Sequence, residues 1–249
     1  MDIARWFLGY DTISPRVLSI GGRLGYEDAG DTPNTQTVIH DYPGAPLIFE
    51  TRGLPKAKEF QTKVDRKSPK YWDRNMDNYR GSKIGVIIQC ENGYVVVPSY
   101  TAADAFDNDG NKIQSWKGGA DHYANFLDAV STNDQSKLNA PILEGHLSSA
   151  LCHTGGLSHQ LGEKATLSDV ESALSKESDI FKDSFGRLKQ HLVANGVKLG
   201  EGSELTLGAD IRFEAESEQV VGNEKAAQMM SREYRTGFEV PSVKVKAAS

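Results

Sequence analysis

The sequence predicts an α+β fold in which a mostly antiparallel, open sheet is covered on one face by helices, with no Rossmann domain. Up to residue 113, short segments rich in β-branched and aromatic residues are separated by turn sequences. After residue 119, apolar residues recur instead with a helical period of about 3.6 residues. The 249 residues fit one ordinary domain with a hydrophobic core.

The beginning of the chain has the pattern of a helix end. Ile3, Phe7 and Leu8 share one helical face, and Gly9 is a natural C-terminal stop. No capping residue precedes them. We therefore expect residues 1–9 to be the remnant of a linking helix and residues 10–249 to form the domain.

Three pairs of segments have the composition of strands joined by turns. They are 37–39 and 47–49 around Pro43-Gly44, 84–89 and 94–97 around Asn92-Gly93, and 102–106 and 112–116 around Asp109-Gly110. Asn-Gly is a strong hairpin signal. Successive hairpins favour a meander of antiparallel strands and argue against a doubly wound parallel sheet.

The second half of the chain predicts helices that cover this sheet. They span residues 122–130, 142–161, 168–176, 181–194 and 224–231. In the longest, Leu143, Leu147, Leu151 and Leu161 form the expected core stripe. Ser168 is the expected cap of the next helix.

Composition excludes several classes of partner. The formal net charge is -6 and no lysine- or arginine-rich run occurs, which argues against nucleic acid and membrane as partners. No apolar stretch is long enough to span a bilayer, and no secretory signal is seen at the start. Cys90 and Cys152 match no metal or redox spacing. We expect two buried thiols in a reducing cytoplasm rather than a disulfide.

Neither a cofactor site nor a metal site is predicted in this chain. The glycines of residues 21–25 lack the Gly-x-Gly-x-x-Gly spacing, and an acidic loop that would repel phosphate follows them. His146 and His153 share a helical face but lie about 10 Å apart along the axis. Zinc bonds of about 2 Å cannot bridge that gap.

Two polar features favour a small-molecule site. Residues 32–36 open a strand with short amide and hydroxyl side chains, which suit sugar hydroxyls. The same residues are also consistent with a proline-directed turn into the strand. Gly155-Gly156 lies inside the long helix, where glycine costs about 1 kcal/mol relative to alanine. The pair predicts close approach of another backbone or a ligand. His153, one turn earlier, either faces that ligand or is a hydrogen-bonded core residue.

Several segments, in order, resemble one family. The run from Asp2 to Gly9 resembles a signature helix of the form His-x-x-Asp, apolar, Ala, Arg, Trp, two apolar residues and Gly. Further similar segments are Gly22-Arg23 with Tyr26, residues 32–36 and 48–55, residues 139–162 and residues 231–235. Together they resemble the Gfo/Idh/MocA oxidoreductases, bacterial type, over essentially the whole chain.

The resemblance implies a fold and an activity for a longer protein. Full-length members join a Rossmann domain, which binds NAD or NADP, to an open antiparallel sheet, and they move hydride to or from a sugar or cyclitol carbon. This chain resembles the C-terminal domain only. The family histidine would lie three residues before Asp2, and the family lysine and cofactor glycines belong to the other half. The chain is thus expected to carry no cofactor and no catalytic residue.

The resemblance also implies a substrate surface and partners. We expect substrate binding by Asp2, Arg23, Asn34, Arg52 and His153, whose charges and amide could position a polyol or sugar acid. Gly156 and His159 depart from the asparagine and tyrosine frequent in the family. Expected partners are a sugar or polyol-like small molecule, further copies of this chain through residues 84–97 on the open sheet face, and, in a split protein, a separate Rossmann-domain chain. The alternatives are a standalone, non-catalytic binding or assembly module and a piece of an NAD-using glycosidase.

Overall fold

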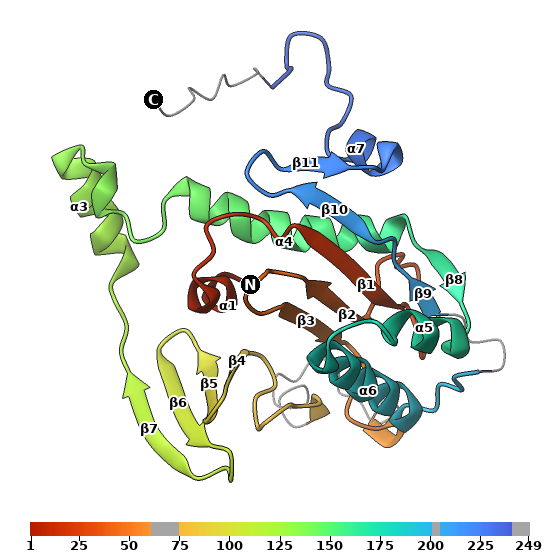
Figure 1. The fold of residues 1–249 in the computed structure, drawn as a ribbon. Helices are drawn as coiled ribbons and strands as arrows, with labels where there is room; N and C mark the ends of the chain where they lie inside the picture. Colours follow the sequence, from red (N-terminus) through yellow and green to blue (C-terminus); the bar gives the residue numbers. More distant parts are fainter. Residues whose placement is uncertain (61–74, 201–204, 241–249) are drawn as a thin grey trace.

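The structure is a computed structural model that describes residues 1–60, 75–200 and 205–240. Within these residues the strands form two sheets, one of seven strands and one of four, with helices packed beside them (Figure 1). Every strand pairing in the two sheets is antiparallel. The predicted α+β class with antiparallel strands is confirmed.

The larger sheet combines strands from both ends of the chain. Its N-terminal strands are β1 (Arg16–Gly22), β2 (Thr35–His40) and β3 (Leu47–Arg52). Its C-terminal strands are β8 (Glu163–Ala165), β9 (Leu205–Leu207), β10 (Ile211–Glu214) and β11 (Gln219–Val221). The order is β11-β10-β1-β2-β3, and β9 pairs with β1 and β8. The predicted simple meander followed by helices is therefore wrong for this sheet, because late strands occupy the second edge of β1.

These late strands escaped the sequence prediction because they are short. β9 and β11 have 3 residues each and β10 has 4, which is too few for a two-residue alternation to stand out. In β10, Ile211 and Phe213 are buried while Arg212 and Glu214 are exposed. That alternation becomes informative only once β1 is known to lie beside it.

The helices follow the predicted order, with shifts at their ends. They are α1 (Asp2–Leu8), α3 (His122–Thr132), α4 (Ile142–Gln160), α5 (Leu167–Leu174), α6 (Asp179–Ala194) and α7 (Glu224–Met229), with short 3₁₀ helices η1 (Lys58–Phe60) and η2 (Gln135–Lys137). Thr166, not the predicted Ser168, caps α5, and it forms a capping box with Asp169. Leu143 is 55% exposed, so the predicted core stripe of α4 begins only at Leu147.

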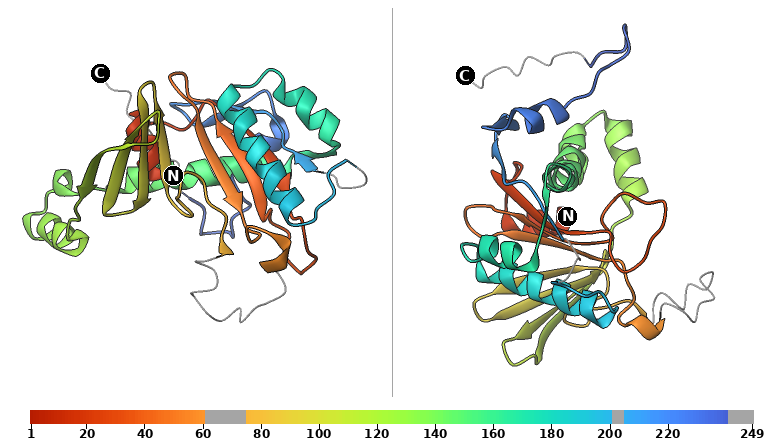
Figure 2. Two further views of the ribbon diagram at one scale, coloured as in Figure 1. Left: turned by 90° about the horizontal axis from the view of Figure 1, so that it is seen from below. Right: turned by 90° about the vertical axis from the view of Figure 1, so that its right-hand side faces the viewer.

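Helices pack on both faces of the larger sheet. α4 crosses one face, while α5 and α6 lie on the other (Figure 2). Neighbouring residues of β2 divide between two core clusters, since Val38 packs with Leu147 on the α4 side and Ile39 packs with Phe181 on the α6 side. The prediction placed helices on one face only. The second layer forms because β2 is buried along its whole length.

The smaller sheet is a four-stranded meander. Its strands, in spatial order, are β4 (Val86–Cys90), β5 (Gly93–Ser99), β6 (Ala102–Asp107) and β7 (Lys112–Lys117). The turns fall where Asn92-Gly93 and Asp109-Gly110 predicted them, which confirms both hairpins. Every residue of β7 is exposed, and the strand leads to α3, which projects away from the larger sheet (Figure 1).

The N-terminal helix is tied to α4. Arg5 is 1% exposed, donates a 2.6 Å hydrogen bond to the carbonyl oxygen of Tyr10, and forms an ion pair with Glu144 at the start of α4. Trp6 donates to the same carboxylate at 2.6 Å. These bonds hold the beginning of the chain against the α4 side of the sheet.

The two thiols differ from the prediction. Cys90 and Cys152 are not bonded to each other, but both are exposed rather than buried. Cys90 ends the edge strand β4, and Cys152 lies on a part of α4 that the sheet does not cover. In the described residues, no helix has the length and apolar character needed to cross a bilayer.

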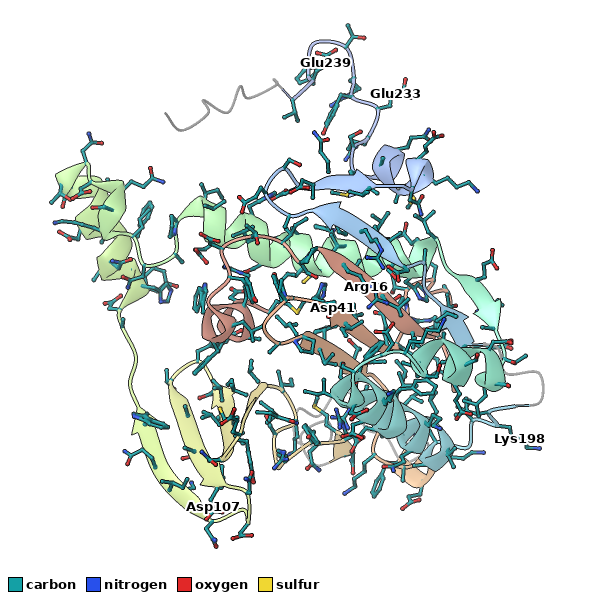
Figure 3. All side chains as sticks on the ribbon, viewed as in Figure 1. Arg16, Asp41, Asp107, Lys198, Glu233 and Glu239 are labelled. Atoms are coloured by element: carbon teal, nitrogen blue, oxygen red, sulfur yellow. The ribbon has the colours of Figure 1, made fainter. Side chains whose placement is uncertain are left out.

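Arg16 links three parts of the larger sheet's rim. It donates hydrogen bonds of 3.2 Å to Asp41, 2.6 Å to Glu177 and 2.9 Å to Asp210. Figure 3 shows Arg16 and Asp41 next to one another beside the first strands. These contacts connect β1 to the turn after β2, the turn before α6 and the approach to β10.

Gly21 offers a direct test of the packing between β1 and β2. A Cβ atom there would lie 2.6 Å from the Cα of Gln36 and would also overlap the carbonyl oxygen of Thr35. Both are backbone atoms of a buried strand and cannot move aside. Gly21→Ala should therefore lower the free energy of unfolding in urea by about 2–3 kcal/mol.

Gly22→Ala is the matched control. Its Cβ would meet only the Leu24 side chain, at 3.5 Å, which is ordinary van der Waals contact. The alanine should leave stability unchanged or raise it by up to about 1 kcal/mol. Equal losses in the two variants would contradict this account of Gly21.

Candidate functional site

Strand β2 presents alternate residues to two different helices. Val38 lies under α4, because a Cβ atom on Gly155 would be 3.3 Å from its side chain. The Thr37 hydroxyl lies 2.5 Å from a serine hydroxyl of α6. Since side chains alternate along a strand, Gln36 and His40 share the α4 side with Val38. The two faces of β2 therefore carry separate sets of polar groups.

A pocket of about 250 Å³ lies on the α4 side. β2, β3, α4 and the start of the chain form its walls through Met1, Thr32, Pro33, Gln36, Val38, His40, Phe49, Leu151, Cys152, Gly155 and Gly156. This volume is slightly below the range of about 300–1,000 Å³ typical of pockets for drug-sized ligands. A molecule of a few carbon atoms fits that size.

His40 lines this pocket and carries two polar atoms that are themselves buried. Its side chain is 1% exposed, and neither ring nitrogen has a hydrogen-bond partner among the described residues. Burial lowers the pKa of His40 to about 3, with a smaller contribution from the N-terminal ammonium. The ring is therefore neutral near pH 7 and offers one donor and one acceptor. Leaving such groups unpaired costs about 1–3 kcal/mol each.

Gln36 contributes a second unpaired group on the same face. It is 9% exposed, and its side-chain nitrogen has no partner in the part of the chain that the structure describes. It lies four positions before His40, so the two Cα atoms are about 13 Å apart along the strand. The two side chains can therefore contact different ends of one small molecule.

The glycine pair in α4 shapes the opposite wall. Gly155 packs against the side chain of Val38 and not against another backbone, which the prediction had named as one of its two possibilities. A Cβ atom on Gly156 would meet no atom within 4 Å, so this position borders open space. Cys152, one turn earlier, adds an exposed thiol to the same wall.

The α6 side of the sheet carries a layer of paired charges. Arg52 donates to Asp77 at 3.0 Å and lies 3.6 Å from Glu50, while Arg187 of α6 donates to Glu50 at 3.1 Å. The Nδ1 atom of His191 is 3.1 Å from the Asp77 carboxylate. Burial raises the pKa of Asp77, but the hydrogen bond with His191 and the charge of Arg52 outweigh it and bring the pKa below its usual value. The charges of this layer are thus satisfied internally.

The structure does not bring the five predicted substrate-binding residues to one surface. Arg52 pairs with Thr35 in the sheet and thus faces α6, on the side away from α4 and His153. His153 is exposed on α4, outside the pocket walls. Asp2 is exposed on α1, with its carboxylate 3.9 Å from the N-terminal amine. Because side chains alternate along β3, Arg52 faces away from α4 and does not share a site with His153.

The other two predicted residues stabilise the loop between β1 and β2. Arg23 forms an ion pair with Asp28, which holds the pKa of that carboxyl below its usual value, and donates to the carbonyl oxygen of Thr32 at 3.0 Å. Asn34 donates to the carbonyl oxygen of Leu24 at 2.9 Å and accepts from its amide at 3.1 Å. Neither residue lines the pocket, so their hydrogen bonds serve the loop's own conformation.

The sequence predicted some of the residues in the pocket walls but not His40. The polar stretch 32–36 and the glycine pair supply Thr32, Gln36 and both glycines of the walls. His40 was missed. The one signal available was the two-residue spacing of Gln36, Val38 and His40, which places them on one strand face.

The described residues contain no group of three or more His, Cys, Asp or Glu side chains that could hold a metal ion. His146 instead lies 2.8 Å from the Glu218 carboxylate. Compared with family models, with curated proteins and with solved structures, the chain gives no match. The pocket on the α4 side of β2 is therefore the structural feature from which a function is proposed.

The buried His40 ring predicts a specific pH dependence of stability. Burial lowers the pKa of His40 from the ordinary 6.5 to about 3, so between these pH values the unfolded chain binds a proton that the folded chain does not. Stability is lost as pH falls through this window, by at most about 1.4 kcal/mol per pH unit. His40→Phe removes the proton site and the unpaired nitrogens. It should stabilise the chain by about 1–3 kcal/mol at pH 7, and by about 2 kcal/mol more at pH 5.

Urea unfolding of both proteins at pH 7 and pH 5 measures this effect. His159, whose pKa burial also lowers, is present in both proteins and so cancels in the difference. A constant difference between the two proteins at both pH values would mean that folding does not shift the pKa of His40, which would contradict the prediction.

Proposed function

We propose that this chain is the substrate-binding and oligomerising part of an NAD(P)-dependent oxidoreductase that acts on sugars or related polyols, and that the chain is inactive alone. The observation that carries the proposal is the pocket on the α4 side of β2, with the unpaired polar atoms of His40 and Gln36 in its walls. The family resemblance of the sequence supplies the class of reaction. The pocket supports the binding half of that reaction only.

The pocket residues can bind and orient a hydroxylated molecule. The unpaired nitrogens of Gln36 and His40 are buried in the unliganded chain, so both side chains must turn toward the pocket before they can hydrogen-bond a hydroxyl group. Phe49 and Leu151 give the walls apolar surface for carbon–hydrogen faces. With a pKa near 3, His40 is too weak a base to take a proton from an alcohol at neutral pH. Proton removal in the proposed reaction therefore falls to the nucleotide-binding half.

The described residues do not fit a dinucleotide. Gly21 and Gly22 are strand residues of β1, not a turn that opens a helix. The loop that follows carries Glu27, Asp28 and Asp31, whose charges would repel a pyrophosphate. Cofactor binding in this proposal therefore belongs to a nucleotide domain, either joined ahead of Met1 or made as a separate chain. Reading the coding DNA upstream of Met1 for an in-frame Rossmann sequence that ends in histidine three codons before Asp2 tests the joined form.

Calorimetry tests the binding half of the proposal. Sorbitol, myo-inositol or glucose titrated into the chain at millimolar concentration should give a binding isotherm. His40→Phe should weaken it by about tenfold, because hydrogen bonds worth about 1.4 kcal/mol are lost. NAD⁺ and NADP⁺ should give no isotherm at micromolar concentration.

Arg52→Met is the matched control for this measurement. Arg52 lies on the α6 face, so its loss should reduce stability without changing polyol affinity. The proposal would be contradicted if either nucleotide bound at micromolar concentration. It would also be contradicted if His40→Phe and the unaltered chain bound the polyol with equal affinity.

A second candidate function, a non-catalytic assembly module, is favoured by the exposed apolar residues of the smaller sheet and α3. Ile84 is 76% exposed, Ile113 63%, Tyr123 72% and Leu127 63%. Exposed apolar groups in this number are typical of an interaction surface. Assembly and substrate binding are compatible, so this candidate displaces the first only if no small molecule binds the pocket.

We expect the chain to form dimers or tetramers through residues 84–97. Ile84→Asp places a charge on that surface and should shift the sedimentation coefficient at micromolar protein toward the monomer value. Gln114→Asp is the control. Gln114 is exposed and already polar, so a charge there should leave assembly unchanged. A monomeric unaltered chain at that concentration would contradict the prediction.

A further inference from the structure

Helix α3 has an apolar face that the described part of the chain leaves uncovered. The face consists of Tyr123, Phe126, Leu127 and Val130, which are between 58% and 72% exposed. With 3.6 residues per turn, these four side chains lie within an arc of about 100° on one side of the helix. Asp128 lies on the opposite side of the helix. The face itself therefore carries no charge.

The contacts that α3 makes within its own chain lie on another side of the helix. Its main neighbour is the short helix η2, and the side-chain amide of Asn125 donates a 2.7 Å hydrogen bond to the carbonyl oxygen of Lys137 there. Ala129, one turn after Asn125, is the buried residue of α3. Neither Asn125 nor Ala129 belongs to the apolar face, so η2 leaves that face open.

The sequence specifies this helix at both of its ends. Asp121 accepts hydrogen bonds of 3.0 Å from the backbone amides of Tyr123 and Ala124, and Asn133 ends the helix with a φ of 50°. However, α3 has only 11 residues, and isolated helices shorter than about 12–15 residues are marginal in water. Such a helix gains most of its stability from the packing of an apolar face. We therefore expect α3 to be stable only when its apolar face is covered.

We propose that residues 118–141, between β7 and α4, form an arm that is exchanged between two copies of this chain. The apolar face of α3 in one copy packs on the smaller sheet of the other. Ile84, Ile113 and Trp116 give that sheet the exposed apolar side chains that receive the arm. The inference rests on the proposed assembly through residues 84–97 and names the segment that covers this surface.

The connection between β7 and α3 suits such an exchange. The amide of Gly118 donates a 2.9 Å hydrogen bond to the carbonyl oxygen of Thr101, which holds the end of the sheet in place. Gly119 follows directly, and two successive glycines give this connection a backbone freedom that other residues lack. Exchange of an identical element between copies is a low-cost route to a dimer. A change of direction at these glycines leaves both the sheet and the helix intact.

The size of the apolar face favours a second copy over an unlike partner. A buried aromatic side chain covers about 150–250 Å², so the four residues together offer roughly 400 Å². With an equal area on the receiving sheet, one arm buries roughly 800 Å², which is the scale of crystal-packing contacts. A two-fold dimer makes this contact twice and buries roughly 1,600 Å², which is the standard size of a specific interface.

Amide hydrogen exchange over a range of protein concentrations tests the arm directly. At micromolar concentration a second copy covers α3, so the amides of residues 125–132 should be protected. After dilution to nanomolar concentration the same amides should exchange at least about tenfold faster, because the uncovered helix unfolds locally. Residues 147–157 of α4, which pack on the larger sheet, provide the internal control and should exchange at the same rate at both concentrations.

Leu127→Glu and Ala124→Glu form a matched pair of variants. Glutamate is a good helix former, and both positions are exposed in the single chain, so neither change disturbs its core. Leu127→Glu places a charge on the apolar face. It should abolish the protection of α3 and raise the dissociation constant of the dimer, measured by sedimentation, at least about tenfold. Ala124 lies outside the face, so Ala124→Glu should change neither measurement.

The outcomes separate the arm from the assembly on which it rests. Concentration-dependent protection of α3 that is lost in Leu127→Glu supports both. A dimer whose α3 exchanges freely, or whose dissociation constant is unchanged in Leu127→Glu, overturns the arm and leaves assembly through residues 84–97 standing. Protection of α3 at every concentration places the helix on its own chain and likewise overturns the arm. A monomer at micromolar concentration with α3 unprotected overturns both, and leaves the face to an unlike partner.

Discussion

The burial of β2 on both of its faces is the constraint on which the rest of the structure depends. All six of its residues are buried, and their side chains alternate between α4 and α6. A polar residue in this strand must therefore find a partner inside the protein or remain unpaired. Thr37 has its partner on α6, whereas His40 has none in the described residues. The Thr35 hydroxyl, on the α6 side, is also buried without a partner in the described residues, so the candidate site is defined by the pocket beside His40.

The two sides of the sheet separate charged from neutral polar groups. On the α6 side, Arg52 and Arg187 face Glu50 and Asp77 at hydrogen-bonding distances, so their charges are compensated within the layer. A compensated layer of this kind holds α6 on the sheet but has no net charge to offer a ligand. The α4 side has no such pairs in its pocket walls, and its low polarity keeps His40 neutral.

The sequence predicted local structure well and the composition of the site poorly, for different physical reasons. Turn chemistry at Asn92-Gly93 and the helical period of residues 142–161 act locally, so both could be read from the chain. The site depends on strand parity, because a shift of one residue exchanges the two faces of a sheet. Arg52 was expected to share a surface with His153, but its pairing with Thr35 turns it toward α6. Only the long-range contacts of β2 with α4 and α6 fix that assignment.

The unpaired nitrogens of His40 have a consequence for how binding and stability are coupled. They are buried without partners among the described residues, which reduces the stability of the fold. A ligand that binds only the folded chain stabilises it by about RT ln(1 + [L]/Kd), which reaches about 2.7 kcal/mol at one hundred times Kd. An apolar residue at this position would give a more stable empty chain but would offer the ligand nothing to bond. The proposed binding role would account for a histidine at this position, where packing alone would favour an apolar residue.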